Sequence, residues 1–159
     1  MANNCNYQIQ VVGKSKESVG RMFRILSNKD GEFYLYRVFS AAEADPPEED
    51  GGLWRAVYIG DVAWATDQWI DVPSDMERRM SNGAYLANIA DVCRALDVGV
   101  EVWAEEFGNG IQRHFIVDHF GIVNVDDRKW GLRMSDRDSM ELLDGLEDFG
   151  SWEDRKAVY

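Results

Sequence analysis

Two alternating runs that meet at a glycine-rich pivot constrain the fold of this 159-residue chain more than any other feature. The stretch from Glu101 to Asp118 reads EVWAEEFGNGIQRHFIVD, and apolar and polar residues alternate on both sides of Gly-Asn-Gly. A period of two is typical of a half-buried strand, and glycine accepts the positive φ that a tight turn needs. The pattern predicts a β-hairpin with strands over 99–104 and 111–118 and a turn over 105–110.

The start of the chain predicts a strand followed by a helix. Alternation around Ile9 indicates a strand over 6–12. Apolar residues then recur at helical spacing after Ser15, a residue type favoured at the N-cap, and predict a helix over 16–27. A run of aromatic and branched residues favours a second strand over 32–39.

An acidic, proline-containing segment interrupts the pattern. Residues 41–52 read AAEADPPEEDGG and combine five carboxylates with two prolines and two glycines. This composition offers little apolar surface to bury, so we expect a mobile, projecting loop. A strand resumes over 54–59. Residues 60–80 have no clear period and receive no assignment.

The second half predicts another helix and a possible sixth strand. An apolar stripe that includes Leu86, Ile89 and Cys93 indicates a helix over 84–96, and Gly121 to Val125 extends the sheet. The resulting order is strand, helix, strand, strand, helix, strand and strand. It predicts an α+β fold of the ferredoxin-like, split βαβ type, in which two helices cover one face of an antiparallel sheet.

We expect two domains that differ in composition, a ferredoxin-like domain over 1–125 and an acidic C-terminal extension over 126–159. The extension carries ten acidic and six basic residues. Ser135 or Asp136 could cap a short helix in it, and we expect this helix to dock on the chain's own core or on a partner. Its apolar side consists of Met140, Leu143, Leu146 and Phe149.

Charge and composition exclude several classes of protein. Acidic residues outnumber basic ones 29 to 17, a net charge of −12, which repels phosphate backbones and disfavours direct binding to nucleic acid. The same excess favours a basic partner surface. No stretch reaches the ~20 apolar residues of a membrane span. With no secretion signal and only Cys5 and Cys93, we expect a cytoplasmic protein whose buried cysteines are free.

Candidate catalytic groups are sparse. His114 and Asp118 lie on the same face of the predicted strand but about 13 Å apart, too far for a direct acid–base pair, and His119 falls on the opposite face. Glu101 is expected on the solvent face, and Glu105 and Glu106 are expected to flank the turn. No phosphate-binding loop, nucleophile elbow or dinucleotide fingerprint is present, so we predict neither a cofactor nor a metal site.

Three stretches carry a resemblance to a known family. Met1-Ala-Asn-Asn-Cys-Asn-Tyr-Gln-Ile-Gln-Val-Val-Gly13 resembles the starts of the YubB-like ferredoxin-fold domains, which are common on plasmids, prophages and integrated elements. Gly60-Asp-Val-Ala-Trp-Ala65 resembles that group's Gly-Asp-Cys-Ala-Trp-Ser signature. The segment from Val98 to Phe115 is similar to its Glu-x-x-Ser-Glu-Glu-x-Gly-x-Gly-x-x-Glu-His segment. The resemblance covers about residues 1–125.

The chain departs from the family pattern at three positions. Val62 and Ala65 stand where the group often has Cys and Ser, and Arg113 stands where a glutamate usually precedes the histidine. The family has no established enzymatic activity. The resemblance therefore implies a fold and a mobile-element context, and a fold alone does not fix a function.

The preferred hypothesis is a non-enzymatic binder from a phage or mobile element, in which acidic residues engage a basic surface on a host defence or nucleic-acid machine. An anti-CRISPR or anti-restriction inhibitor is its concrete form. One alternative is a small hydrolase or nucleotide-processing enzyme that uses His114, nearby carboxylates and Trp64. Another is an oligomeric scaffold, for instance a homodimer. The partner-binding residues predicted by the preferred hypothesis are Glu43, Asp45, Glu48, Glu49, Asp50, Asp144, Glu147, Asp148 and Trp54.

Overall fold

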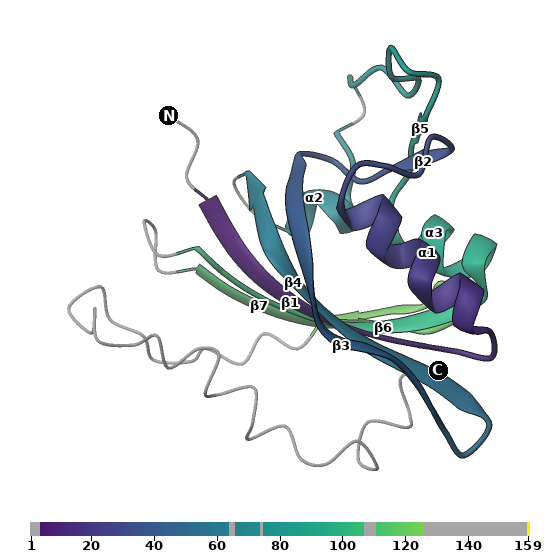
Figure 1. The fold of residues 1–159 in the computed structure, drawn as a ribbon. Coiled ribbons are helices and arrows are strands. Elements are labelled where there is room, and N and C mark those ends of the chain that lie inside the picture. Colours follow the sequence, from purple (N-terminus) through teal and green to yellow (C-terminus); the bar gives the residue numbers. More distant parts are fainter. Residues whose placement is uncertain (1–3, 64–65, 74, 107–110, 126–158) are drawn as a thin grey trace.

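The structure is a computed structural model that describes residues 4–63, 66–73, 75–106, 111–125 and 159. It has an α+β fold in which helices are few and strands dominate (Figure 1). The elements are β1 (Asn4–Gly13), α1 (Lys16–Leu26), β2 (Phe33–Tyr34), β3 (Val38–Asp50), β4 (Leu53–Ala63), α2 (Asp67–Ile70), β5 (Tyr85–Leu86), α3 (Ile89–Leu96), β6 (Val98–Glu106), β7 (Ile111–Val117) and β8 (Val123–Val125).

A six-stranded sheet forms the body of the described chain. Its strand order is β3-β4-β1-β6-β7-β8, and every neighbouring pair is antiparallel. Strands β2 and β5 form a separate, parallel pair. The predicted hairpin is confirmed as β6 and β7, although β6 continues to Glu106, and the short strand β8 extends the sheet as expected.

Local sequence explains the first helix well. Ser15 has an extended backbone, and its side chain accepts a hydrogen bond from the Ser18 amide at 3.1 Å, which caps α1. The helix ends one residue before the predicted boundary, and Asn28 beyond it adopts a positive φ of 56°. This is one of the few non-glycine residue types that tolerate such a conformation, so it closes the helix at low cost.

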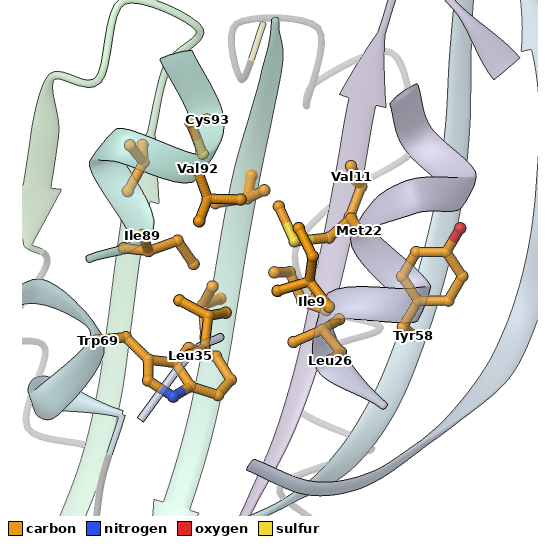
Figure 2. Packing of buried hydrophobic residues seen from close by; sticks show 14 of the residues in the cluster. Ile9, Val11, Met22, Leu26, Leu35, Tyr58, Trp69, Ile89, Val92 and Cys93 are labelled. Atoms are coloured by element: carbon orange, nitrogen blue, oxygen red, sulfur yellow. The ribbon is translucent and has the colours of Figure 1, made fainter. Parts of the chain in front are cut away.

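The main core lies between the sheet and the helices. Alternate residues of β1, including Ile9 and Val11, point to this side and are fully buried. Figure 2 shows Met22 and Leu26 of α1 and Ile89 and Val92 of α3 packed over these strands, with Trp69 of α2 beside them. Helices α1 and α3 lie on the same side of the sheet (Figure 1).

Trp69 comes from the segment over 60–80, for which the sequence predicts no regular structure, and it packs into this core. Its indole nitrogen donates a hydrogen bond to the Tyr36 carbonyl at 3.1 Å. Its ring meets the Tyr7 ring edge-on, with centroids 5.0 Å apart. Aromatic pairs prefer this geometry, and a buried indole N–H needs an acceptor, so both requirements are met within the core.

The second helix begins later than predicted. It starts at Ile89, not at 84, because Asn88 caps it by accepting a hydrogen bond from the Asp91 amide at 2.8 Å. Tyr85 and Leu86 instead form β5 and pair with β2. The predicted strand over 32–39 is likewise divided, since Leu35 and Tyr36 lie in a turn between β2 and β3.

The expected mobile loop over 41–52 is wrong, because most of it belongs to β3, which pairs with β4 as far as Asp50. Only Gly51 and Gly52 form the turn, and both have positive φ. Strand β4 provides the hydrogen-bonding partner, and its buried residues Ala56, Val57 and Tyr58 supply the apolar surface that the acidic segment lacks. A strand at the sheet edge needs a partner on one side only, so its side chains can be charged.

The opposite face of the sheet, here called the far face, is buried in part. The strand registers place eight buried residues on it, and their exposed fractions run from 0 to 6%. Five of them are polar or charged, unlike the residues of the main core. These residues are Gln10, Val12, Arg55, Val57, Glu101, Trp103, Glu105 and His114.

Tyr159 is described although the preceding residues are not. Its hydroxyl donates a hydrogen bond to the Asp97 carboxylate at 2.8 Å, and its ring stacks on His119 with centroids 4.2 Å apart. The hydroxyl has a raised pKa of about 12, because of burial and the hydrogen bond with Asp97. The helix predicted in the C-terminal extension lies outside the described residues.

Both cysteines are buried thiols, as predicted. Burial raises the pKa of the Cys93 thiol, which keeps it protonated and unreactive in the folded state. In the portion of the chain that the structure describes, every helix is too short or too polar to cross a membrane.

Candidate protein-binding surface

Five carboxylates follow one another along the outer strand of the sheet. We call residues 43–50 of β3 the acidic edge, because β3 pairs with β4 on one side and has no strand on the other among the described residues. All five predicted binding carboxylates of this segment are exposed. They are Glu43, Asp45, Glu48, Glu49 and Asp50.

Two prolines sit inside the acidic edge without breaking the pairing. The register between β3 and β4 shifts between Glu43 and Asp45 and again between Asp45 and Glu48, which marks bulges. Pro46 and Pro47 fall in the second bulge. Proline cannot donate a backbone hydrogen bond, so in sheets it is confined to edge strands and bulges. Pro46 and Pro47 meet both conditions, because they lie in a bulge of an edge strand.

The bulges place carboxylates on both sides of the hairpin. Glu48 is opposite Arg55 and points to the far face, whereas Glu49 is opposite Trp54 on the helix side. Asp50 bonds the Arg55 guanidinium at 2.7 Å. Within the described part of the chain, this is the ion pair that the acidic edge makes, so its other four carboxylates keep their charges open to solvent.

The acidic edge is hollowed as well as charged. A depression of about 390 Å³ is lined by Asp45, Pro46, Glu48, Glu49, Asp50 and Arg55. It therefore combines four carboxylates with one largely buried guanidinium. A concave surface of one charge concentrates the field, so it favours a protruding cationic side chain over a flat or anionic partner.

Trp54, the predicted aromatic member of the surface, has a mainly structural place. It is half-buried, pairs with Gly13 of β1, and packs against the core. The Lys16 ammonium lies 5.6 Å from its ring centroid. Trp54 thus borders the acidic edge with part of its ring already covered. The other predicted binding residues, Asp144, Glu147 and Asp148, lie outside the described residues, as does Trp64.

A second cluster, on the far face, differs from the sequence prediction. Glu101 was expected in solvent but is 5% exposed, and its Oε1 lies 2.9 Å from Nε2 of His114. The Trp103 ring stacks on the imidazole with centroids 3.7 Å apart and planes within 9°. Glu105 is also buried, at 3% exposed. These side chains are buried, so they are interior groups.

The hairpin register explains the pairing of Glu101 with His114. Trp103 is directly opposite His114, and Glu101 is opposite Ile116, so the two ionisable residues are diagonal neighbours on one face. Such neighbours are within reach of long side chains. Counting residues outward from the Gly-Asn-Gly turn could have found this contact. Spacing along β7 alone, as between His114 and Asp118, does not reveal it.

The remaining candidate groups have structural partners. The Asp118 carboxylate accepts hydrogen bonds from the Phe120 and Ile122 amides at 2.9 and 3.0 Å and holds the turn before β8. His119 stacks on Tyr159. Among the described residues, no three metal-ligating side chains gather in one place.

Comparison with known proteins adds no relative to this description. No family model matches the chain. No curated protein and no solved structure matches it either.

Proposed function

We propose that this chain is a non-enzymatic, acidic protein-binding module from a phage or mobile element, and that the acidic edge engages a basic surface on a host protein. A nucleic-acid-binding defence complex is the partner class we favour, and inhibition of CRISPR or restriction machinery is the concrete activity. The observation that carries the proposal is the hollow of about 390 Å³ among exposed carboxylates. Localisation in the cytoplasm, where free thiols stay reduced, fits this role.

Electrostatics gives a reason for this choice of partner. Exposed carboxylates along one strand repel one another and are relieved by cationic groups, so association with a basic surface gains from charge complementarity. The gain should weaken with salt, since the screening length falls from about 10 Å at 0.1 M to about 3 Å at 1 M. A basic groove that holds nucleic acid has the required charge, and an acidic edge could occupy it in place of phosphates.

The strand arrangement supports the finer fold assignment that we propose. Strands β1, β3, β4 and β6, with α1 and α3 between them in sequence, have the order β3-β4-β1-β6 with antiparallel neighbours. That order and the helices on one face are those of a ferredoxin-like, split βαβ domain. We propose that β7 and β8 extend such a domain.

The test reverses charge on the acidic edge and compares it with an equal reversal elsewhere. The edge variant is Asp45→Lys/Glu48→Lys/Glu49→Lys, which leaves the Asp50–Arg55 pair intact. The matched control is Asp71→Lys/Asp75→Lys/Glu77→Lys, because these three residues are exposed and the net charge changes equally. Purified CRISPR effector complexes and restriction enzymes are the probes, in pull-down and cleavage-inhibition assays.

The proposal expects the edge variant to lose binding and inhibition by tenfold or more, with the control close to the unmodified chain. A separate Asp144→Lys/Asp148→Lys variant measures the contribution of the C-terminal extension. Equal losses in the edge variant and the control would mean that net charge alone matters. Binding that survives reversal at both the edge and the extension would overturn the proposal.

The enzymatic alternative has one observation in its favour, the 2.9 Å contact between His114 and Glu101. A carboxylate beside an imidazole can orient it as a general base. The pair is 5% exposed, so a substrate would first have to displace whatever covers it. Hydrolysis of a nucleotide or ester by the unmodified chain that disappears in both His114→Asn and Glu101→Gln would favour this alternative.

The scaffold alternative rests on exposed apolar residues at the other sheet edge. Phe120 is 67% exposed, and Ile122 and Val125 lie close to it in sequence with similar exposure. Grouped apolar residues of this kind can mark an interface. A dimer in light scattering that Phe120→Ser/Ile122→Ser converts to a monomer would support this reading, and it would leave the acidic edge irrelevant to association.

A further inference from the structure

An aromatic side chain is exposed on the same strand as the acidic edge. Phe39 belongs to the first part of β3, and 54% of its surface is open to solvent. A single exposed apolar residue is ordinary on a protein surface, so its surroundings decide whether it has a role in binding. The surroundings of Phe39 are the backbone of β3, the neighbouring strand β4 and the acidic edge.

A bulge in the backbone keeps Phe39 out of the regular strand pairing. Val38 is opposite Val62 and Ser40 is opposite Asp61, which are consecutive residues of β4, so no residue of β4 lies opposite Phe39. Bulges at sheet edges commonly redirect a side chain. The exposed position of Phe39 is therefore built into a paired strand and does not result from a loose chain end.

Apolar surface continues beyond Phe39 on an open part of the far face. Ala42 is opposite Ile59, and Ile59 is opposite Gln8, which shares the far face with its neighbour Trp103. Ala42 is exposed, and Ile59 is half-buried. We call Phe39, Ala42 and Ile59 the apolar strip. Its exposure shows that this part of the sheet is accessible to a partner.

The apolar strip leads into the hollow of the acidic edge. After Ala42, the next residues of β3 that the register places on the far face are Asp45, opposite Val57, and Glu48, opposite Arg55. Asp45 and Glu48 both line the hollow. Three residues separate Ala42 from Asp45, a distance of about 10 Å in an extended strand. Apolar and acidic surface are thus continuous along one strand.

A surface with these two parts can select a partner in two ways. Charge attraction steers a basic partner to the acidic edge, but it is screened by salt and would accept almost any polycation. An aromatic side chain that enters a pocket of its partner often contributes a large share of the binding energy. Salt does not screen this apolar contact, so it supplies the specificity that charge alone lacks.

We propose that Phe39 is the aromatic anchor of the binding surface and that the partner is a basic protein with an apolar socket beside its cationic groups. This inference rests on the proposed function, because it adds an apolar contact to the charged contacts proposed there. Phe39 takes the role that the sequence predicted for Trp54, whose ring packs against the core and lies beside Lys16. The chain should therefore distinguish its partner from an unspecific polycation.

The first test compares two exposed phenylalanines in the full chain. The variant is Phe39→Ser, and the matched control is Phe120→Ser, because Phe120 is 67% exposed and lies near the opposite edge of the sheet. The probes are polylysine and whichever purified CRISPR effector complex or restriction enzyme binds the unmodified chain. Phe39→Ser should weaken binding to the protein partner by tenfold or more and leave binding to polylysine within twofold. Phe120→Ser should change neither.

Two further measurements separate an apolar contact from a general disturbance of the surface. Phe39→Leu keeps an apolar side chain, so it should recover most of the affinity that Phe39→Ser loses. Raising the salt from about 0.1 M to about 0.5 M should leave the affinity ratio between the unmodified chain and Phe39→Ser unchanged. The ratio between the unmodified chain and Asp45→Lys/Glu48→Lys/Glu49→Lys should shrink over the same range.

The second test needs no host protein and uses two synthetic peptides with equal numbers of lysines, one of which also carries leucines. Binding to the full chain is followed by two-dimensional NMR. Both peptides should shift the amide signals of the acidic edge. Only the leucine peptide should also shift Phe39 and Ala42, and it should bind at least threefold more tightly. Phe39→Ser should make the two affinities equal.

The possible failures point to different claims. Equal affinities of the two peptides, with shifts confined to the acidic edge, would overturn the role of Phe39 and leave the charged contacts standing. Equal losses of partner binding in Phe39→Ser and Phe120→Ser would overturn it as well. If neither peptide binds and reversal of the acidic edge has no effect on any partner, the proposed function fails, and this inference fails with it.

Discussion

Carboxylates occupy two contrasting settings in this molecule, the body of the domain and the acidic edge. In the body, Asp30 bonds the Arg21 guanidinium at 2.9 and 3.1 Å and the Phe33 amide at 3.0 Å, and Glu101 contacts His114. At the edge, residues such as Glu48 and Glu49 face solvent. The contrast teaches that a net charge of −12 says little about binding until the internally paired charges have been separated from the open ones.

The largest effect is expected where a buried pair is broken. Glu101→Ala removes the carboxylate that contacts the buried His114, so the free energy of unfolding should fall by about 3–5 kcal/mol. The matched change at the edge, Glu48→Ala, removes an exposed group and should alter it by less than about 0.5 kcal/mol. Urea unfolding monitored by tryptophan fluorescence measures both. Equal losses of unfolding free energy in the two variants would contradict the difference between the buried and the exposed carboxylate.

A smaller, pH-dependent effect is expected at Asp30. Burial alone would raise the pKa of this carboxyl, but hydrogen bonds from Arg21 and the Phe33 amide outweigh burial and lower the pKa. Its stabilising contribution is therefore present above the ordinary pKa of about 4 and is lost as pH falls through the lower folded value. Asp30→Asn should cost about 1.5–3 kcal/mol at pH 7.

The pH profile of Asp30→Asn separates this explanation from a simple packing loss. The cost should shrink steadily as the pH is lowered from 5 toward 2, because the unmodified chain loses the same interaction by protonation. Exposed Asp75 provides the control, since Asp75→Asn should leave the profile unchanged. A cost at Asp30 that is independent of pH would contradict the role assigned to its charge.

A backbone effect of similar or smaller size is expected where the body meets the edge. Gly60 pairs with Tyr7 of β1 on one side and Ala41 of β3 on the other. A Cβ there would lie 2.2 Å from the Ser40 carbonyl oxygen and 2.5 Å from the Tyr7 hydroxyl, so something must shift. Gly60→Ala should lower the free energy of unfolding by about 1–3 kcal/mol.

Gly20 is the matched control for that substitution. It lies inside α1, and a Cβ there would meet nothing within 4 Å. Gly20→Ala should raise the free energy of unfolding by about 0.5–1 kcal/mol, because alanine loses less conformational freedom in a helix than glycine. Thermal unfolding followed by circular dichroism should show opposite signs for the two variants, and the same sign for both would contradict the steric account.

The smallest effect on stability is expected at the acidic edge itself. Asp45→Lys/Glu48→Lys/Glu49→Lys should change the free energy of unfolding by no more than about 0.5 kcal/mol per site, because these side chains are exposed. Reduced repulsion among neighbouring carboxylates could make the change slightly stabilising, and salt should diminish it. Calorimetry at low and high salt measures this, and a large loss of stability would place the edge among the structural carboxylates.

Local periodicity predicted much of this fold. Ile9 and Val11 alternate into the core, and the helix after Ser15 follows the apolar spacing closely. Pairing between strands that are distant in sequence could not be predicted from local periodicity. Tyr85 and Leu86 continue an apolar stripe that is compatible with a helix, and only their pairing with β2, some fifty residues earlier, makes them a strand. Tertiary context overrides such local preferences.

The sequence predicted the residues of the candidate site but not the strand that they form. The acidic residues of 43–50 were singled out for their charge, yet their composition suggested a loop, because nothing local reveals that β4 will supply a partner strand. Glu101 was placed in solvent for a related reason. Alternation predicts which residues share a face, but it does not say whether another segment covers that face.

The two prolines of the acidic edge have a consequence for how any partner can approach. An incoming strand could extend the sheet only by bonding to a regular ladder of outward amides. Pro46 and Pro47 supply none, and the bulge that contains them and the bulge before it disturb the spacing. A neighbouring chain therefore cannot add itself as a seventh strand along this margin. Recognition there must proceed through side chains, which also protects the protein from polymerising through this edge.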